Sequence, residues 1–136
     1  MKRFATANWK GSGKDGSGTN STQSGVLKNA KYTYKSRFEE EVGTNPEELV
    51  AAAHAACFTM KLSFVLNAAG FTADNIDTKC TITLDNGAIT ESHLNVKATV
   101  PGIDAAKFEE SVVEAKANCP ISKLLNTNIT HEATLV

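Results

Sequence analysis

The sequence contains little cysteine, no excess of either charge and no long hydrophobic run. Its three cysteines, Cys57, Cys80 and Cys119, are too few and odd in number for a disulfide scaffold. Fourteen basic residues stand against fifteen acidic ones, so no basic surface favours nucleic acid. The longest strongly apolar stretch, residues 49–58, is too short to span a bilayer, and the first residues lack the apolar core of a signal peptide. We therefore expect a soluble, cytoplasmic protein with reduced thiols that binds neither nucleic acid nor a membrane.

The length of 136 residues fits a single domain, residues 1–136, or two intimately joined lobes, and is large enough to bury a core without a metal or a disulfide. Hydrophobic periodicity and turn residues predict the order of its elements. We expect N-terminal strands within residues 1–40, a central helix over 45–70, a hairpin over 75–100, a helix over 104–118 and a C-terminal strand over 128–136. This order predicts an α+β fold with largely antiparallel sheets.

Two glycine-rich signals predict turns. Residues 11–18, GSGKDGSG, look at first like a phosphate-binding loop, but they lack the Walker spacing and no apolar strand leads into them. The dipeptide Asp15-Gly16 favours the tip of a hairpin or a loop instead. Asn86-Gly87 is a strong signal for a tight hairpin turn between two alternating segments.

Residues 31–39 alternate between two kinds of side chain and predict a half-buried strand. The polar side of this strand carries Arg37. The other side carries Tyr32, Tyr34, Ser36 and Phe38. Arg37 is therefore expected on a solvated strand face.

The central helix has a clear start and a clear stop. Thr44 or Asn45 can cap it, Pro46 suits its first position, and Gly70 is expected to end it. Its alanines make it a thin helix that a neighbouring element can approach closely. The apolar residues that recur at helical spacing are Leu49, Ala53, Ala56, Met60 and Phe64.

The three thiols differ in their surroundings. Cys57 lies within one helical turn of His54 and Lys61, and a nearby cation lowers a thiol pKa; packing of Cys57 as a small hydrophobe is an equal alternative. Cys119 ends the apolar stripe of the helix over 104–118, and its place just before Pro120 also favours a thiolate, although spacing alone favours a core role. Cys80 lies on the apolar face of a strand, where a free cysteine usually fills the core.

Two other chemistries of cysteine and histidine fit the sequence less well. Only His54 and Cys57 are near neighbours, and no second ligand pair follows at a spacing typical of zinc sites, so we expect no metal and no cofactor. A cysteine hydrolase would need a residue that orients the base and a loop that binds the oxyanion, and neither is identifiable.

A longer motif points to a family. The segment SRFEEEVGTNPEELVAAAHAACF, residues 36–58, resembles the OsmC/Ohr family of thiol peroxidases, and most closely its osmotically inducible OsmC branch. The similarity continues through STQSGVL (21–27), AGFTADNIDT (69–78), VPGIDAAKF (100–108) and AKANCPISKLL (115–125). It therefore covers nearly the whole chain, in order.

The resemblance implies a role for four residues. Cys57 corresponds to the peroxidatic cysteine and Cys119 to the resolving cysteine, with which it would form a disulfide. Arg37 corresponds to the arginine that holds the thiolate, and Glu47 to the acid that orients this arginine. The activity implied is reduction of organic hydroperoxides, and more slowly of hydrogen peroxide, to alcohols or water, with a dithiol reductant such as a lipoyl group and a role in oxidative or osmotic stress.

The resemblance also implies a homodimer. Family members resemble intertwined homodimers, in which antiparallel sheets from both subunits wrap around long central helices. Glu47 and Cys57 are ten residues apart, hence about 15 Å along one helix, so an arginine from another element must bridge them or two chains must form the site.

The substrate and the class of function leave alternatives open. Four apolar residues are candidates to line a pocket for an alkyl group, although core packing would also explain them: Phe58, Met60, Phe64 and Leu124. The alternative function is a non-catalytic ligand-binding or stress-response protein that keeps the fold.

Overall fold

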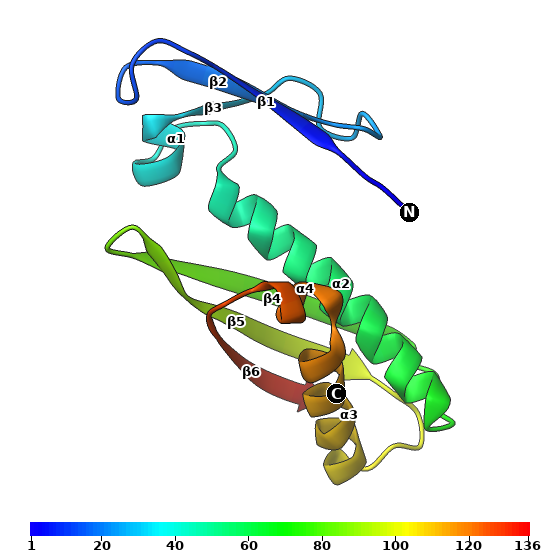
Figure 1. The fold of residues 1–136 in the computed structure, drawn as a ribbon. Helices are drawn as coiled ribbons and strands as arrows, with labels where there is room; N and C mark the ends of the chain where they lie inside the picture. Colours follow the sequence, from blue (N-terminus) through cyan, green and yellow to red (C-terminus); the bar gives the residue numbers. More distant parts are fainter. The chain divides into compact units, whose positions relative to one another are not determined.

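The computed structural model describes residues 1–136, and the chain divides into two compact units, Met1–Leu49 and Val50–Val136. Figure 1 labels the helices and strands of both. Each unit contains one three-stranded sheet. The units are described in turn.

The N-terminal unit is built on an antiparallel sheet of β1 (Ala5–Lys10), β2 (Ser17–Thr22) and β3 (Ala30–Thr33), in that order. The glycine-rich segment forms the loop between β1 and β2, as predicted. Gly18 faces Trp9 on one side and Tyr32 on the other. A Cβ atom at Gly18 would lie 2.6 Å from the Tyr32 ring and 2.1 Å from a backbone oxygen, so only glycine fits there.

The strand predicted over residues 31–39 is wrong beyond Thr33. The chain turns there into the short helix α1 (Tyr34–Phe38), which carries Arg37. The cause is a capping box: the Thr33 side chain accepts from the Ser36 backbone N–H, and the Ser36 hydroxyl accepts from the Thr33 backbone N–H. Of the face expected to be buried, only Ser36 is buried, and Phe38 is 51% exposed.

Helix α2 (Pro46–Ala68) begins at the end of this unit and confirms the predicted central helix. The Asn45 side chain accepts a hydrogen bond from the backbone N–H of Glu48, 2.8 Å away, and so caps the helix. Gly70, with φ of +89°, follows its end in the left-handed conformation that glycine adopts without strain.

The apolar residues of α2 that recur at helical spacing do not mark its buried face. Met60 and Phe64 are each 65% exposed. The side chains that α2 buries are His54, Phe58, Leu62, Val65 and Leu66. Because alanine and other apolar residues surround the helix on nearly every side, periodicity does not single out one face.

The 23 residues of α2 also exceed the apolar stretch considered above. By length and composition alone this helix is able to cross a membrane. The core helix of a soluble protein meets the same criterion, and α2 contributes five buried side chains to the unit that contains most of it.

The sheet of the C-terminal unit has the order β4 (Asn75–Asp85), β5 (Ala88–Thr99), β6 (Asn128–Leu135). The hairpin between β4 and β5 is confirmed, with positive φ at both Asn86 and Gly87. The last pair differs from the expected antiparallel arrangement, since β5 and β6 are parallel. Parallel neighbours need a long crossover, and the helices α3 (Ala105–Asn118) and α4 (Pro120–Leu124) provide it.

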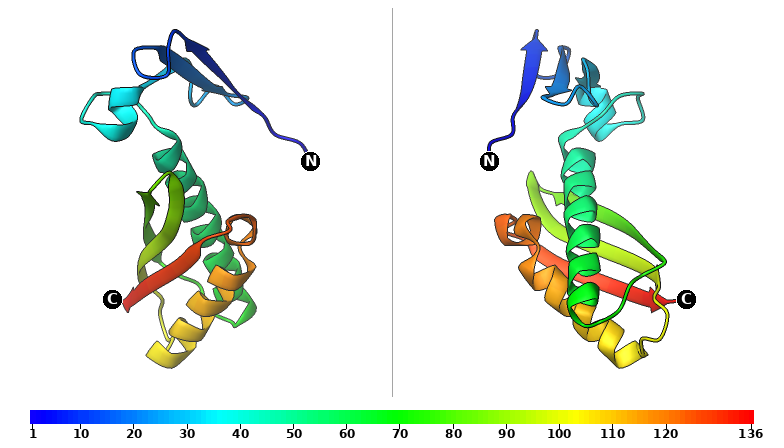
Figure 2. Two further views of the ribbon diagram at one scale, coloured as in Figure 1. Left: turned by 60° about the vertical axis from the view of Figure 1, so that its left-hand side comes forward. Right: turned by 90° about the vertical axis from the view of Figure 1, so that its right-hand side faces the viewer.

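The core of the C-terminal unit lies between its helices and its sheet. Helices α2 and α3 cover the same face of the sheet (Figures 1 and 2). The predicted stripe of α3 is confirmed, because its members are all buried: Phe108, Val112, Ala115 and Cys119. They pack with Phe58, Leu62 and Leu66 of α2 and with Leu94, Val96 and Ala98 of β5.

Candidate active site

Two of the predicted site residues, Cys57 and Cys119, meet in the C-terminal unit. Cys57 lies in the middle of α2 and is half-buried, while Cys119 lies between α3 and α4 and is fully buried. Their Sγ atoms are 2.8 Å apart, and both thiols are free. A disulfide bond requires about 2.05 Å between sulfurs, so small side-chain movements suffice to join them.

The surroundings of Cys57 act on its pKa in opposite directions. Burial raises the pKa of the Cys57 thiol, and the hydrogen bond with Cys119 raises it further. A hydrogen bond from the backbone N–H of Ile121, in the first turn of α4, lowers it. The start of α4 therefore favours a thiolate at Cys57. The sequence instead predicted that this helix start would favour a thiolate at Cys119, but the Cys119 side chain makes no capping hydrogen bond.

His54 does not act as the cation beside Cys57. It is fully buried, with its Nδ1 atom 2.7 Å from the Ser92 hydroxyl and its Nε2 atom 2.8 Å from the Ser122 hydroxyl. Burial lowers the pKa of His54, which favours the neutral ring. This network could not be predicted from the sequence, because Ser92 and Ser122 lie 38 and 68 residues further along the chain.

The other two predicted residues, Arg37 and Glu47, meet in the N-terminal unit. Arg37 Nη2 lies 2.7 Å from Glu47 Oε1, and its Nε donates to Glu47 Oε1 and Oε2 at 3.1 and 3.2 Å. The hydrogen bond with Glu47 raises the pKa of Arg37, so the guanidinium remains charged. Helix α1 supplies the arginine and the first turn of α2 supplies the carboxylate, which holds the planar group in a fixed orientation.

Cys80 agrees with the core role predicted for it. Its side chain packs against the core of the C-terminal unit, and burial raises the pKa of its thiol. Its Sγ atom lies 3.3 Å from the Ser92 hydroxyl. No group of three or more His, Cys, Asp or Glu side chains is arranged to hold a metal ion.

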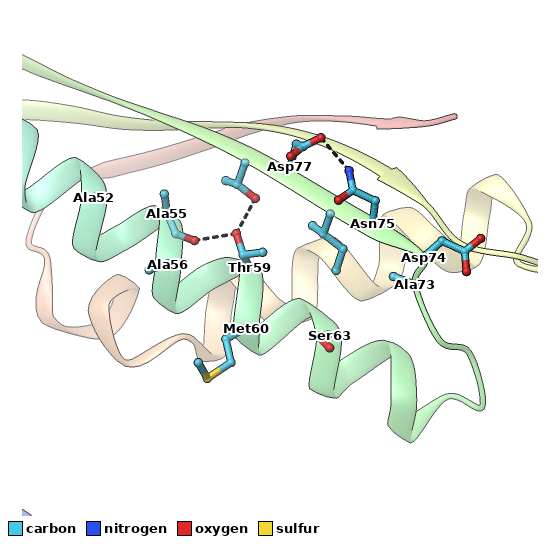
Figure 3. Close-up of a pocket in the computed structure, with 12 residues that line it drawn as sticks. Ala52, Ala55, Ala56, Thr59, Met60, Ser63, Ala73, Asp74, Asn75 and Asp77 are labelled. Atoms are coloured by element: carbon cyan, nitrogen blue, oxygen red, sulfur yellow. Dashed lines mark hydrogen bonds between the residues drawn. The ribbon is translucent and has the colours of Figure 1, made fainter.

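The four apolar candidates for an alkyl pocket do not form one within the chain. Phe58 is fully buried in the core, whereas Met60, Phe64 and Leu124 are 65%, 65% and 74% exposed. An open groove of about 780 Å³ lies between α2 and β4 (Figure 3). Small side chains of α2 such as Ala52 and Ala56 line one side of it.

Residues 38–134 of the sequence match a family model described as "OsmC-like protein". The chain belongs to this family. It is 51% identical over 128 residues to Peroxiredoxin OsmC of Escherichia coli (strain K12), covering 91% of this chain and 90% of the relative. It is 34% identical over 91 residues, 63% of each chain, to the "Organic hydroperoxide resistance protein-like 2" of Staphylococcus epidermidis.

Solved structures of OsmC-like proteins have the same fold. An OsmC-like protein from Mycoplasma pneumoniae superposes with a TM-score of 0.79 over 100% of this chain and 98% of its own, at 17% sequence identity. At this level of identity the similarity concerns the fold alone. The observed α+β arrangement of two small sheets and a long helix is therefore that of OsmC-like proteins.

Proposed function

We propose that this protein is a cysteine-based peroxidase that reduces organic hydroperoxides, and hydrogen peroxide more slowly, to alcohols or water. The observation that carries the proposal is the contact of 2.8 Å between the free sulfurs of Cys57 and Cys119. The Cys57 thiolate attacks the outer peroxide oxygen, the O–O bond breaks, and a sulfenic acid forms while the departing alkoxide takes a proton from solvent and leaves as the alcohol. The Cys119 thiol then attacks that sulfur, so a disulfide forms and water leaves.

A dithiol closes the cycle by thiol–disulfide exchange, which returns both cysteines to thiols and oxidises the reductant to a disulfide. A lipoyl-type dithiol suits this step. Membership of the OsmC-like family, and the name peroxiredoxin of a relative with 51% identity, make the chain an enzyme of the peroxidase type. The name of the Staphylococcus epidermidis relative supports organic hydroperoxides as substrates. We infer that the reaction takes place in the cytoplasm.

Within this function, the Arg37–Glu47 ion pair activates the thiol of Cys57. Burial and Cys119 both hold the pKa of Cys57 up, and the Ile121 N–H opposes them. A permanent cation beside the sulfur would lower that pKa. We propose that Arg37, oriented by its bonds to Glu47, provides this cation for the Cys57 thiolate in the assembled enzyme.

We further propose that the enzyme is an intertwined homodimer, in which two copies of the single domain complete one another. The N-terminal unit supports this, because none of its apolar side chains is buried. Helix α2 supports it as well, since Met60 and Phe64 lie largely exposed beside alanines. Exposed apolar side chains on one helix are typical of a surface that a partner covers.

The test is a steady-state assay with the intact protein, verified to carry reduced thiols. Cumene hydroperoxide, tert-butyl hydroperoxide and hydrogen peroxide are compared, each with dihydrolipoamide, dithiothreitol and glutathione as reductant. Turnover with a dithiol and a higher kcat/KM for the organic peroxides is expected. Absence of turnover with every combination of peroxide and reductant would instead favour a non-catalytic, ligand-binding protein.

A further inference from the structure

The mechanism leaves unused a buried histidine beside the thiols. His54 lies one helical turn before Cys57 and is fully buried. Its two ring nitrogens bond to hydroxyls on two different elements, Ser92 on β5 and Ser122 on α4. The ring therefore connects the central helix, the middle strand of the sheet and the short helix that follows Cys119.

The bonds of His54 are well matched to a neutral ring. A neutral imidazole has one N–H donor and one acceptor nitrogen, and a serine hydroxyl can fill either role. One serine therefore accepts from the ring and the other donates to it. No buried side-chain nitrogen or oxygen in the chain lacks a hydrogen-bond partner, so the network is complete.

The bond to Ser122 matters most, because α4 has only five residues and carries much of the site. Cys119 is its N-cap residue, and the N–H of Ile121 donates to the Cys57 sulfur. Besides the bond from the Ile121 N–H and the packing of Ile121 on the core, two side-chain hydrogen bonds join α4 and the segment before it to α2: Cys57–Cys119 and His54–Ser122. Oxidation of Cys57 changes the first of these contacts, whereas the second does not involve the reacting atoms.

We propose that His54 is a positioning residue that holds α4 through Ser122, so that Cys119 and the Ile121 N–H stay against Cys57 throughout the catalytic cycle. The inference rests on the proposed function only in assigning Cys119 the resolving step. Its physical content is that the His54–Ser122 bond raises the effective concentration of one thiol at the other. Loss of this bond retains both cysteines but lets α4 move away from α2, so that their pairing becomes less favourable.

The test compares two buried serines that bond to the same ring. Ser122→Ala removes the link to α4, and Ser92→Ala, the matched control, removes the link to the sheet. Each full-length protein is equilibrated with reduced and oxidised glutathione, and the Cys57–Cys119 disulfide is quantified by alkylation and mass spectrometry. Loss of a buried hydrogen bond predicts a fall of about tenfold in the equilibrium constant for disulfide formation in Ser122→Ala, and little change in Ser92→Ala.

Two substitutions of the histidine provide a second comparison. In His54→Gln the terminal amide reaches the place of Nε2 and can bond to Ser122; in His54→Asn it takes the place of Nδ1 and can bond only to Ser92. Rescue is therefore expected with glutamine and not with asparagine. If His54 were only structural, both substitutions would lower the equilibrium constant for disulfide formation equally. Near-ultraviolet circular dichroism verifies that each variant is folded.

The glutathione equilibrium needs no peroxide, so its result is independent of the proposed function. If the wild-type chain forms the disulfide but reduces no peroxide, the function is wrong while the role of His54 is still measured. If Ser122→Ala and Ser92→Ala change the equilibrium constant equally, or not at all, the positioning role of His54 is overturned. With active enzyme, Ser122→Ala should also accumulate more Cys57 sulfinic acid than Ser92→Ala at excess peroxide, because its sulfenic acid waits longer for Cys119.

Discussion

The two units of the chain differ in what holds them together. In Val50–Val136, thirteen hydrophobic residues form one buried cluster between two helices and a sheet. In Met1–Leu49, the buried residues are Gly18, Ser36 and Thr44, and none is apolar. Hydrophobic burial is the main favourable term in folding, so the C-terminal unit can hold its shape by itself, whereas the N-terminal unit lacks that support.

This difference divides the candidate site as well. The thiols that change their bonds in the proposed reaction lie at the edge of a packed core, where a contact of 2.8 Å can be maintained. The Arg37–Glu47 pair lies in the unit without a core. The thiol chemistry should therefore depend on the C-terminal unit alone, whereas its acceleration should depend on what covers the N-terminal unit.

Removal of each thiol should have the largest effect. Cys57→Ser should abolish turnover, because serine does not form the sulfenic acid. Cys119→Ser should consume one equivalent of peroxide and stop at a sulfenic acid that is open to overoxidation. Stopped-flow peroxide consumption and mass spectrometry of the quenched protein distinguish the two.

Cys80→Ser is the matched control, since Cys80 packs in the same core without touching the other thiols and should leave turnover intact. Normal multiple turnover of Cys119→Ser with a dithiol would contradict resolution by Cys119, or would mean that the reductant attacks the sulfenic acid directly.

Substitution of Arg37 should have the next largest effect. Arg37→Ala should raise the pKa of Cys57 further and slow peroxide attack about a hundredfold, the usual cost of removing a group that stabilises charge at a reacting centre. Arg37→Lys should rescue only partly, because an ammonium lacks the planar fork that bonds to Glu47. Glu47→Gln should be milder than Arg37→Ala, since the cation remains.

Thiolate absorbance near 240 nm, titrated against pH in the Cys119→Ser and Cys80→Ser background, reports the pKa of Cys57 in each of these variants. An unchanged thiol pKa in Arg37→Ala would remove the arginine from the site. Lys61, four residues after Cys57 on α2, would then be the next cation to test.

The sequence predicted best where local signals and tertiary packing agree. The bounds of α2, the Asn86-Gly87 turn and the buried stripe of α3 followed from caps, turn residues and periodicity. The prediction failed where two local signals favour different structures. Alternation over residues 31–39 suggested a strand, and the capping box of Thr33 and Ser36 decided for a helix.

The candidate site, too, was predictable only in part. The motif identified the cysteines, Arg37 and Glu47, and each of these pairs is in contact within its own unit. The roles of His54 and Ile121 were not predictable, because both depend on the crossover that returns α4 to the middle of α2. This crossover belongs to the parallel pairing of β5 with β6, and no local sequence signal predicts that pairing.

A charge on the exposed face of α2 should test what covers the apolar side chains. Phe64→Asp should weaken the proposed dimer about a hundredfold, because it removes a large apolar side chain from the interface and buries a carboxylate there. Sedimentation velocity across a range of protein concentrations measures the change. Val113→Asp is the control, since Val113 is a partly exposed apolar residue of α3; equal dissociation of both variants would place the interface elsewhere, and a monomeric wild type would rule out the dimer.

The smallest expected effect is a pH dependence of stability that arises from His54. Burial lowers the pKa of His54 below its ordinary value of 6.5 in the folded protein, while the unfolded chain keeps that ordinary value. As the pH falls below 6.5, the unfolded state binds a proton before the folded state does, so the free energy of unfolding decreases with decreasing pH until the folded pKa is passed. At pH above 6.5 both states are neutral and this contribution is complete.

Urea unfolding at pH 7.5 and 5.5 should therefore show a smaller loss of stability in His54→Gln than in the wild type, because glutamine can bond to Ser122 but has no proton to gain. Equal losses in the two proteins would mean that His54 titrates alike in both states, and that its ring is not held neutral between Ser92 and Ser122.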